Sequence, residues 1–154
     1  MSKQEVILSE KPEQSLTKAI QQIAFDKLFI LTDENTHRFC LPLIQEIECL
    51  KGTDPILIGA GDTHKTLETL ASVWKALGDR GASRHSLLIN LGGGMVTDLG
   101  GFAASTFKRG IPYINVPTTL LAMVDASVGG KTGINFNGLK NEVGVFAPAQ
   151  SVII

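Results

Sequence analysis

One glycine-rich segment of the 154-residue sequence, MVDASVGGKTGIN at residues 123–135, combines charged side chains with glycines in an unusual way. It runs from Asp125 through two glycines to Lys131, which is followed by a threonine and a third glycine. A turn does not need a lysine held between glycines, and a solvated lysine does not need glycines around it. Because an ammonium group is a compact point charge that suits phosphate or carboxylate, Lys131 is a candidate for contact with an anion.

Further polar residues extend this candidate site. Lys140 and Asn141 follow within a stretch that has little helix or strand signal of its own. Two lysines together with Arg109 could bind a doubly anionic substrate. A flexible surface loop is the alternative that the residue types alone leave open.

A second glycine-rich segment, LLINLGGGMVTDLGGFAAS, begins in the fourth apolar run of the sequence, and its three consecutive glycines follow directly after that run. Gly93 and Gly94 would let backbone N–H groups approach a pyrophosphate at the start of a helix that is entered through Thr97 and Asp98. The G-x-G-x-x-G spacing fails, because Thr97 occupies its last position. A tight strand-to-helix turn without a ligand is therefore the competing interpretation. Asp98 would be either an N-terminal cap or a partner for a ligand hydroxyl or amide.

Polar residues also follow two other apolar runs. Asp33 and Asn35 come just after the second run, where an acid can bind a ribose hydroxyl or cap the next helix. Both interpretations of Asp33 remain open. Thr118 and Thr119 follow the fifth run, where paired hydroxyls can meet a ligand.

A charged turn precedes the third amphipathic stretch. It contains Gly61, Asp62, His64 and Lys65. From their chemistry alone, these residues are expected to form a helix start with solvated charges.

The sequence offers no metal site of its own. His37, His64 and His85 are scattered, with no i, i+4 pair and no carboxylate at ligand spacing. Cys40 and Cys49 do not form a C-x-x-C pair, and we expect two free, buried thiols in a cytoplasmic protein.

The elements that must position these residues follow from hydrophobic periodicity. Five apolar runs are expected to be strands, at residues 5–9, 27–32, 55–60, 86–91 and 111–117. Three amphipathic stretches are expected to be helices, at residues 12–24, 34–50 and 63–81. Pro42 would kink or restart the second of these. Strand and helix alternating in this way predict an α/β domain with a mostly parallel sheet.

Within each amphipathic stretch, apolar side chains recur at helical spacing and predict the face toward the core. These side chains are Leu16, Ile20 and Ile23 in the first stretch, Phe39, Leu43, Ile47 and Leu50 in the second, and Leu67, Leu70, Val73, Trp74 and Leu77 in the third.

Length, composition and charge restrict the class of protein. The chain has room for one domain, and 44% hydrophobic with 19% charged residues are typical of a globular core. A net charge of −1 without a basic patch argues against a nucleic-acid or anionic-membrane partner. The N-terminus lacks the apolar core of a signal peptide, and no run approaches ~18 apolar residues. The open apolar end SVII favours a fragment of a longer protein.

Taken together, the motifs resemble the 3-dehydroquinate synthase family. LGGGMVTDLGGFAASTFKRGIPYINVPTTLLAMVDASVGGKTGIN, followed by KNEVGVF, is closely similar to that family, and the similarity extends to GDTHKTLETLASVWKAL. It covers most of the chain, strongly from about residue 61 onward, and VDASVGGKTGIN is its most specific part. Iron-dependent alcohol and glycerol dehydrogenases share the three-glycine loop and the acid after it, but not normally the lysine loop.

The resemblance implies a Rossmann-like domain at residues 1–154 that binds NAD within a two-domain enzyme. The family is a group of carbon–oxygen lyases of the shikimate pathway, which convert 3-deoxy-arabino-heptulosonate 7-phosphate to 3-dehydroquinate and phosphate. NAD takes a hydride from this sugar phosphate and returns it. A divalent metal, zinc or cobalt, is implied, with ligands beyond residue 154 in a helical C-terminal domain. A homodimer is implied as well, and the chain alone is expected to be inactive.

Site residues follow from the resemblance by motif. Those implied to bind NAD are Asp33, Asn35, Gly61, Asp62, Lys65, Gly93, Gly94, Met95, Val96, Asp98, Thr118 and Thr119. Those implied to meet both substrate and cofactor are Asp125, Lys131, Lys140 and Asn141. Arg109 is implied to bind the substrate phosphate across a dimer interface.

Departures and alternatives accompany the resemblance. Thr97 stands where the family usually has glycine and narrows the space around the cofactor, and Ala60 and His64 stand at positions that are often Asp and Tyr. Another sugar phosphate cyclase, such as a valiolone or scyllo-inosose synthase, would share the cofactor loop and differ mainly in pocket residues. A stand-alone nucleotide-binding module is disfavoured, because it would need neither Lys131 nor Lys140.

Overall fold

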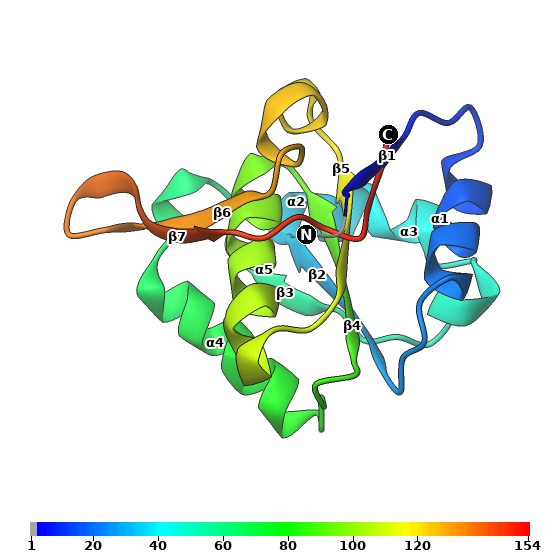
Figure 1. Cartoon of the computed structure of the whole chain (residues 1–154), viewed down its shortest axis with the longest axis horizontal. Helices are drawn as coiled ribbons and strands as arrows, with labels where there is room; N and C mark the ends of the chain where they lie inside the picture. The colour runs from blue at the N-terminus through cyan, green and yellow to red at the C-terminus, as the bar shows by residue number, and fades with distance from the viewer. Residues whose placement is uncertain (1–2) are drawn as a thin grey trace.

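Six parallel strands form the central sheet of the computed structural model, which describes residues 3–154 (Figure 1). Their spatial order is β1 (Glu5–Ile7), β8 (Ser151–Ile153), β5 (Tyr113–Pro117), β4 (Leu87–Gly92), β2 (Leu28–Asp33) and β3 (Ile56–Ile58). Each of the five predicted strand regions overlaps one of these strands, with β2 and β4 ending one residue later than predicted, and the apolar end of the chain forms β8. The pairings within this sheet are parallel, which confirms the predicted α/β fold.

Both faces of the sheet are apolar because helices cover them. On one face, α4 (Leu67–Asp79) and α5 (Gly94–Thr106) contribute to a core that includes Leu31, Leu88 and Val152. On the other face, α1 (Pro12–Gln21) and α3 (Leu41–Ile44) contribute to a core that includes Ile30 and Ile89. Strands covered on both faces need apolar side chains at nearly every position, which explains the nearly continuous apolar runs in the sequence.

Local chemistry sets where the helices begin. α1 has Pro12 in its first turn, where a missing backbone N–H costs nothing. α4 begins after Thr66, whose hydroxyl accepts a hydrogen bond from the backbone N–H of Thr69 at 3.2 Å. As predicted, α4 buries Leu70, Val73 and Leu77, but Leu67 is 43% exposed, so the prediction that it faces the core is wrong.

The helical stretch predicted at residues 34–50 is interrupted, and the predicted restart at Pro42 is confirmed. The segment divides into α2 (Glu34–Phe39), α3 and a 3-10 turn at Glu48–Leu50. Pro42 lies in the first turn of α3, where it starts a new helix because it has no N–H to continue the previous one. The break turns the apolar face, so Leu41 is buried while Phe39 and Leu43 are exposed, contrary to the prediction.

The region after residue 130 is more regular than its glycines suggested. β6 (Lys131–Phe136) and β7 (Leu139–Phe146) form an antiparallel hairpin that packs beside α5 (Figure 1). Its two-residue turn, Asn137 and Gly138, has φ angles of 51° and 76°. Asn-Gly is the typical pair for such a left-handed hairpin turn, so the expectation of little strand signal overlooked an available sign.

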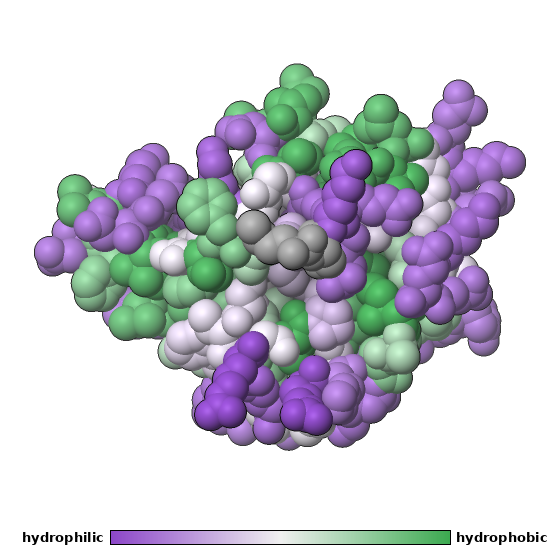
Figure 2. All heavy atoms as spheres, viewed as in Figure 1, coloured by the Kyte–Doolittle hydropathy of each residue, from purple (hydrophilic) through white to green (hydrophobic). Residues whose placement is uncertain are grey.

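A π-helical turn, Ala122–Ala126, connects β5 with the hairpin. It lies at the top of the view in Figure 1, and Figure 2 shows apolar side chains gathered there at the surface. Leu120, Leu121 and Val124 are 75%, 66% and 68% exposed, so this end of the domain presents an apolar surface.

Two further predictions concern the cysteines and membrane-spanning helices. Cys40 and Cys49 are free, but Cys40 is only partly buried and Cys49 is exposed, so the predicted burial of both thiols is wrong. Among residues 3–154, no helix has the length and apolar character needed to cross a membrane.

Candidate functional site

The carboxyl ends of β2, β4 and β5 meet at one edge of the sheet. Register pairs Thr32 with Leu91 and Gly92 with Pro117, so the loops that follow these three strands lie side by side. From β2 the chain moves outward to β3, whereas from β4 it moves the other way to β5. Such a reversal of strand order leaves a crevice outside the carboxyl ends, which is where open α/β sheets bind ligands.

The glycine turn after β4 leads directly into α5. The helix begins at Gly94 with Gly93 as its N-cap residue, so Thr97 and Asp98 lie in its second turn. The predicted entry through Thr97 and the capping alternative for Asp98 are therefore wrong. Because Gly93 has no side chain to cap the helix and the first turn carries no acid, this end favours an anion through its N–H groups and dipole.

The glycine turn packs closely against the segment that leads to the lysine loop. A Cβ on Gly93 would lie 3.1 Å from the Thr119 methyl carbon, and one on Gly94 would lie 3.2 Å from the Cβ of Ala126. Ala126 ends the π-helical turn that carries Asp125. The two glycine-rich segments of the sequence are thus in direct contact.

Lys65 is the centre of a hydrogen-bonded network. Its ammonium lies 2.6 Å from Oδ2 of Asp98 on α5 and 2.5 Å from Oδ1 of Asn141 on β7. Lys65 is only 4% exposed, so the expectation of a solvated charge is wrong at this position. Its backbone carbonyl accepts a hydrogen bond from the N–H of Asn135 on β6 at 2.8 Å. Lys65 therefore connects the turn before α4 with α5 and both strands of the hairpin.

Burial raises the pKa of Asp98 above its ordinary value. The ammonium of Lys65 opposes this rise, whereas the negative charges of Asp125 and Asp62 add to it. Removal of the Asp98 carboxylate from water therefore outweighs its ion pair. Asp125 and Asp62 are therefore close enough to Asp98 for their charges to act on it.

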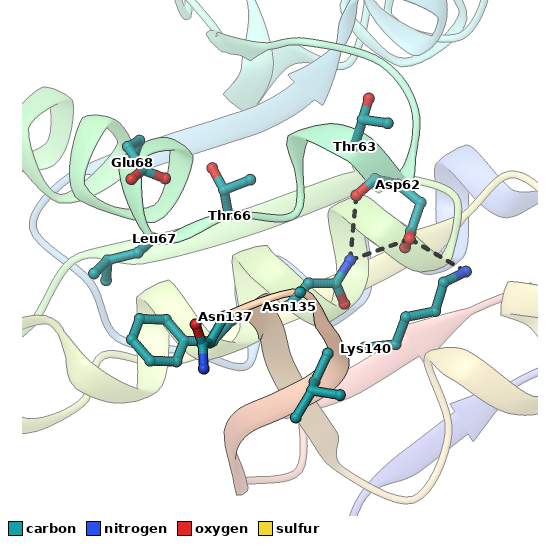
Figure 3. A pocket seen from close by; sticks show the side chains of 11 residues that line it. Asp62, Thr63, Thr66, Leu67, Glu68, Asn135, Asn137 and Lys140 are labelled. Atoms are coloured by element: carbon teal, nitrogen blue, oxygen red, sulfur yellow. Dashed lines mark hydrogen bonds and ion pairs between the residues drawn. The ribbon is translucent and has the colours of Figure 1, made fainter.

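A second set of contacts lies between the charged turn and the hairpin. The Asp62 carboxylate lies 3.1 Å from Nδ2 of Asn135 and 3.4 Å from Nζ of Lys140 (Figure 3). These three side chains border a cavity of about 470 Å³ between the hairpin turn and the start of α4. The N–H of Asn141 donates to Oδ1 of Asn135 at 2.9 Å, which orders the backbone beside Lys140.

Asn135 was not among the residues expected to form the site. It holds Asp62, the Lys65 carbonyl and the Asn141 backbone in place, so it organises both sets of contacts. Its position two residues before the Asn-Gly turn was the available sign, because that spacing fixes its place on the hairpin.

Asp33 caps α2. Its Oδ1 accepts a hydrogen bond from the Thr36 N–H at 2.8 Å, and the Thr36 hydroxyl accepts one from the Asp33 N–H at 3.1 Å. The capping interpretation of Asp33 is thus confirmed. Asn35 is exposed in the first turn of the same helix, at the carboxyl edge of the sheet.

Arg109 lies away from the crevice. It follows α5, and a helix of 13 residues places it about 20 Å from the glycine turn at the usual rise per residue. Together with Arg84 and Lys108, it borders a hollow of about 730 Å³. The structure does not bring Arg109 to the other predicted site residues of its own chain.

The donor groups of the described residues fit a dinucleotide better than a metal ion. A glycine turn against an uncapped helix start suits a pyrophosphate, as argued above. Within residues 3–154, no three His, Cys, Asp or Glu side chains converge on a point where a metal ion could bind. His64 instead turns back to the Ala60 carbonyl, with 2.8 Å between Nδ1 and the oxygen.

The parallel sheet, the strand-order reversal and the glycine turn define a Rossmann-like domain, and solved sugar phosphate cyclases contain a similar one. A 2-deoxy-scyllo-inosose synthase complexed with carbaglucose-6-phosphate, NAD+ and Co2+ superposes with a TM-score of 0.87 and 28% identity, covering 96% of this chain and 41% of that one. A 2-epi-5-epi-valiolone synthase from Streptomyces hygroscopicus, with NAD+ and Zn2+ bound, superposes with a TM-score of 0.84 and 28% identity, covering 99% and 42%.

The chain belongs to the 3-dehydroquinate synthase family, whose N-terminal family model matches residues 55–154. It is 54% identical over 154 residues to the 3-dehydroquinate synthase of Parabacteroides distasonis, covering 100% of this chain and 44% of that protein. It is 44% identical over 144 residues to that of Pyrococcus abyssi, covering 93% and 42%. The chain thus spans less than half the length of these relatives, and the family resemblance is confirmed.

Proposed function

We propose that this chain forms the NAD-binding part of a 3-dehydroquinate synthase. The enzyme would convert 3-deoxy-arabino-heptulosonate 7-phosphate to 3-dehydroquinate and phosphate, as a cytoplasmic lyase of the shikimate pathway. Membership of the family supports the reaction. The observation that carries the proposal is the buried Lys65 network, which joins three elements beside the uncapped start of α5.

The cofactor would lie across the carboxyl edge of the sheet. Backbone N–H groups from Gly94 to Val96 would bind its pyrophosphate, because the helix start favours negative charge. Asp33 and Asn35 would lie toward its adenosine, and Thr118 and Thr119 would line its other side. NAD, when bound, supplies a hydride acceptor that takes a hydride from the substrate and returns it.

The lysines would bind the anionic groups of the substrate. Lys131 is exposed at the start of β6, and the side chain of Lys140 is 79% exposed. The Lys140–Asp62 ion pair is weak because both groups are solvated, so an anionic ligand can replace Asp62 as its partner. Asp125 lies on the turn against Gly94, where a carboxylate can accept a hydrogen bond from a substrate hydroxyl.

A homodimer and a metal-binding part complete the proposal. Because Arg109 lies about 20 Å from the glycine turn, it would bind substrate phosphate at the site of a second copy. The Co2+ and Zn2+ in related cyclases support a divalent metal, whose ligands would come from a helical part that follows these residues in sequence.

The alternative is another sugar phosphate cyclase, such as a 2-epi-5-epi-valiolone synthase. Structural similarity supports it, since such enzymes superpose over nearly the whole chain. Sequence identity favours dehydroquinate synthase, at 54% against 28%.

Two chimeras would test the proposal. In one, residues 1–154 replace the matching segment of the Parabacteroides distasonis 3-dehydroquinate synthase; in the other, they replace that of the Streptomyces valiolone synthase. Phosphate release is measured with NAD and zinc, from the heptulosonate 7-phosphate for the first and from sedoheptulose 7-phosphate for the second. We expect release by the first chimera only. Release by the second alone would favour the alternative, and no release by either folded chimera would contradict the proposal.

Matched lysine variants test whether phosphate release by the active chimera depends on the proposed site. Lys131→Met should lower kcat/KM of the active chimera about 100-fold or more, because it removes a charge that binds the substrate anion. Lys75→Met, on the exposed side of α4, should leave it unchanged. Equal effects of the two changes would contradict the assignment of Lys131.

A further inference from the structure

Two asparagine side chains lie within the apolar face of the sheet that α5 covers. Asn90 on β4 and Asn115 on β5 are paired across neighbouring strands and are 0% and 3% exposed. Nδ2 of Asn90 donates to Oδ1 of Asn115 at 3.0 Å. Burying a polar amide costs free energy unless it is fully hydrogen-bonded. Apolar residues would suit both positions better, so the pair calls for a reason other than packing.

The pair is not fully satisfied within the described residues. Oδ1 of Asn90 is buried without a hydrogen-bond partner there. It lies beside α5, where a Cβ on Gly100 would be only 2.0 Å from it. The Asn90–Asn115 contact therefore comes with an energetic cost, because it leaves the buried Oδ1 of Asn90 unpaired.

The hydrogen bonds continue from the sheet into the loop that carries the proposed site. Nδ2 of Asn115 donates to the carbonyl of Ser127 at 3.4 Å. Nε2 of Gln4 donates to the same carbonyl at 3.2 Å. Ser127 is buried, and its N–H and hydroxyl both donate to the carbonyl of Ala122, at 3.0 and 2.6 Å. Ser127 thus closes the π-helical turn from within, while Asn115 anchors it to the sheet.

The position of the π-helical turn determines the position of Asp125, which lies within it. π-Helical turns are rare and often lie at functional sites. Ala126 touches Gly94 at the start of α5, and Lys131 follows Ser127 by four residues. A shift of Ser127 would therefore move Asp125 and Lys131 relative to the glycine turn.

We propose that Asn90 and Asn115 are positioning residues that fix the π-helical turn through Ser127. Asn90 orients the amide of Asn115, and Asn115 holds the Ser127 carbonyl. The anchoring of the turn stands on the contacts alone. Its consequence for turnover rests on the proposed function, in which Asp125 contacts the substrate.

Amide hydrogen exchange of the chain tests the anchoring without any ligand. In Asn115→Ala, exchange at Ser127 and Val128 should accelerate about tenfold more than exchange at Leu88–Leu91, because the turn loses its side-chain hydrogen bond to the sheet while the backbone hydrogen bonds of β4 remain. Ser86→Ala is the matched control: it removes a buried hydrogen bond, 2.8 Å to Asp26, at the other end of β4. The control should affect the turn and the strand equally. A uniform acceleration in Asn115→Ala would overturn the proposal.

Two further variants keep the test decisive. Asn115→Thr retains a polar residue that suits a strand but is too short to reach Ser127, so it should reproduce the selective acceleration if Asn115→Ala does not fold. Asn115→Gln retains the amide donor on a longer side chain, and it should restore protection of Ser127. Failure of Asn115→Gln to protect Ser127 more than Asn115→Thr would overturn the anchoring role.

A double-mutant cycle in the active chimera tests the consequence for turnover. Asn115→Thr should lower kcat more than it raises KM, and its effect should largely disappear in an Asp125→Ala background, because it acts through Asp125. Ser86→Ala should have the same small effect in both backgrounds. Selective exchange with fully additive kinetics would overturn the link to Asp125 in the proposed function, whereas the anchoring itself would stand.

Discussion

At the scale of single residues, Lys65 shows how burial changes the meaning of a charge. Its side chain is 5% exposed and its partner Asp98 is 20% exposed, so neither group is fully solvated. A buried ion pair adds little net stability, because desolvation cancels most of the attraction. Loss of one partner is costly, since it leaves the other charge buried and unpaired.

Lys65→Met should therefore lower the free energy of unfolding by about 3 kcal/mol, measured by urea denaturation. The change preserves much of the side-chain volume and removes the charge that faces Asp98 and Asn141. Lys75→Met removes an exposed lysine that pairs with Asp79 on the surface of α4, and it should change the same quantity by less than about 0.5 kcal/mol. Similar losses for the two variants would contradict the account of Lys65.

The raised pKa of Asp98 gives a pH dependence of known sign. The folded state holds this proton more tightly than the unfolded state, in which the pKa is near its ordinary value of 3.8. The contribution of Asp98 to stability is thus complete below that value and is lost as the pH rises through its raised folded pKa. The free energy of unfolding of the unchanged chain minus that of Asp98→Asn should fall over this range. A difference that rises with pH would show that the Lys65 ion pair outweighs burial.

At the scale of elements, local sequence signals predicted the sheet well because its strands are covered on both faces. The restart at Pro42 was predicted, but its effect on the buried face was not, because the change of direction at the break decides which side chains face the core. Lys65 was expected in water, since its burial depends on Asp98 and Asn141, which are 33 and 76 residues away in sequence. The hairpin was missed although Asn137-Gly138 marks it.

α5 packs so closely on the sheet that Gly100 has no room for a side chain, unlike Gly78 in α4. A Cβ on Gly100 would lie 2.0 Å from Oδ1 of Asn90 and 2.8 Å from a methyl carbon of Leu31. Gly100→Ala should therefore lower the free energy of unfolding by about 1–3 kcal/mol through overpacking. A Cβ on Gly78 of α4 would meet nothing within 4 Å, so Gly78→Ala should raise stability by about 0.5–1 kcal/mol. Chemical denaturation of both variants checks the prediction, and a stabilising Gly100→Ala would contradict it.

At the scale of the whole molecule, the position of Arg109 distinguishes a site within one chain from a site shared by two copies. In the active chimera, Arg109→Ala and Lys131→Met should each abolish most phosphate release. Refolding the two variants together should restore about a quarter of the unchanged activity, because mixed dimers contain one site with both residues intact. No recovery in verified mixed dimers would contradict the shared site.

The claim that the carboxyl edge of the sheet is the dinucleotide site can be measured most directly by NMR. The chain, labelled with nitrogen-15, is titrated with NAD to millimolar concentration, and the shifted backbone amides are mapped onto the structure. The account predicts that shifts cluster at Gly93–Asp98, Thr118–Thr119 and Asp33–Asn35, and that amides around Ser83–His85 at the amino end of β4 stay unchanged. Shifts centred on the amino end of the sheet, or none at millimolar NAD, would contradict it.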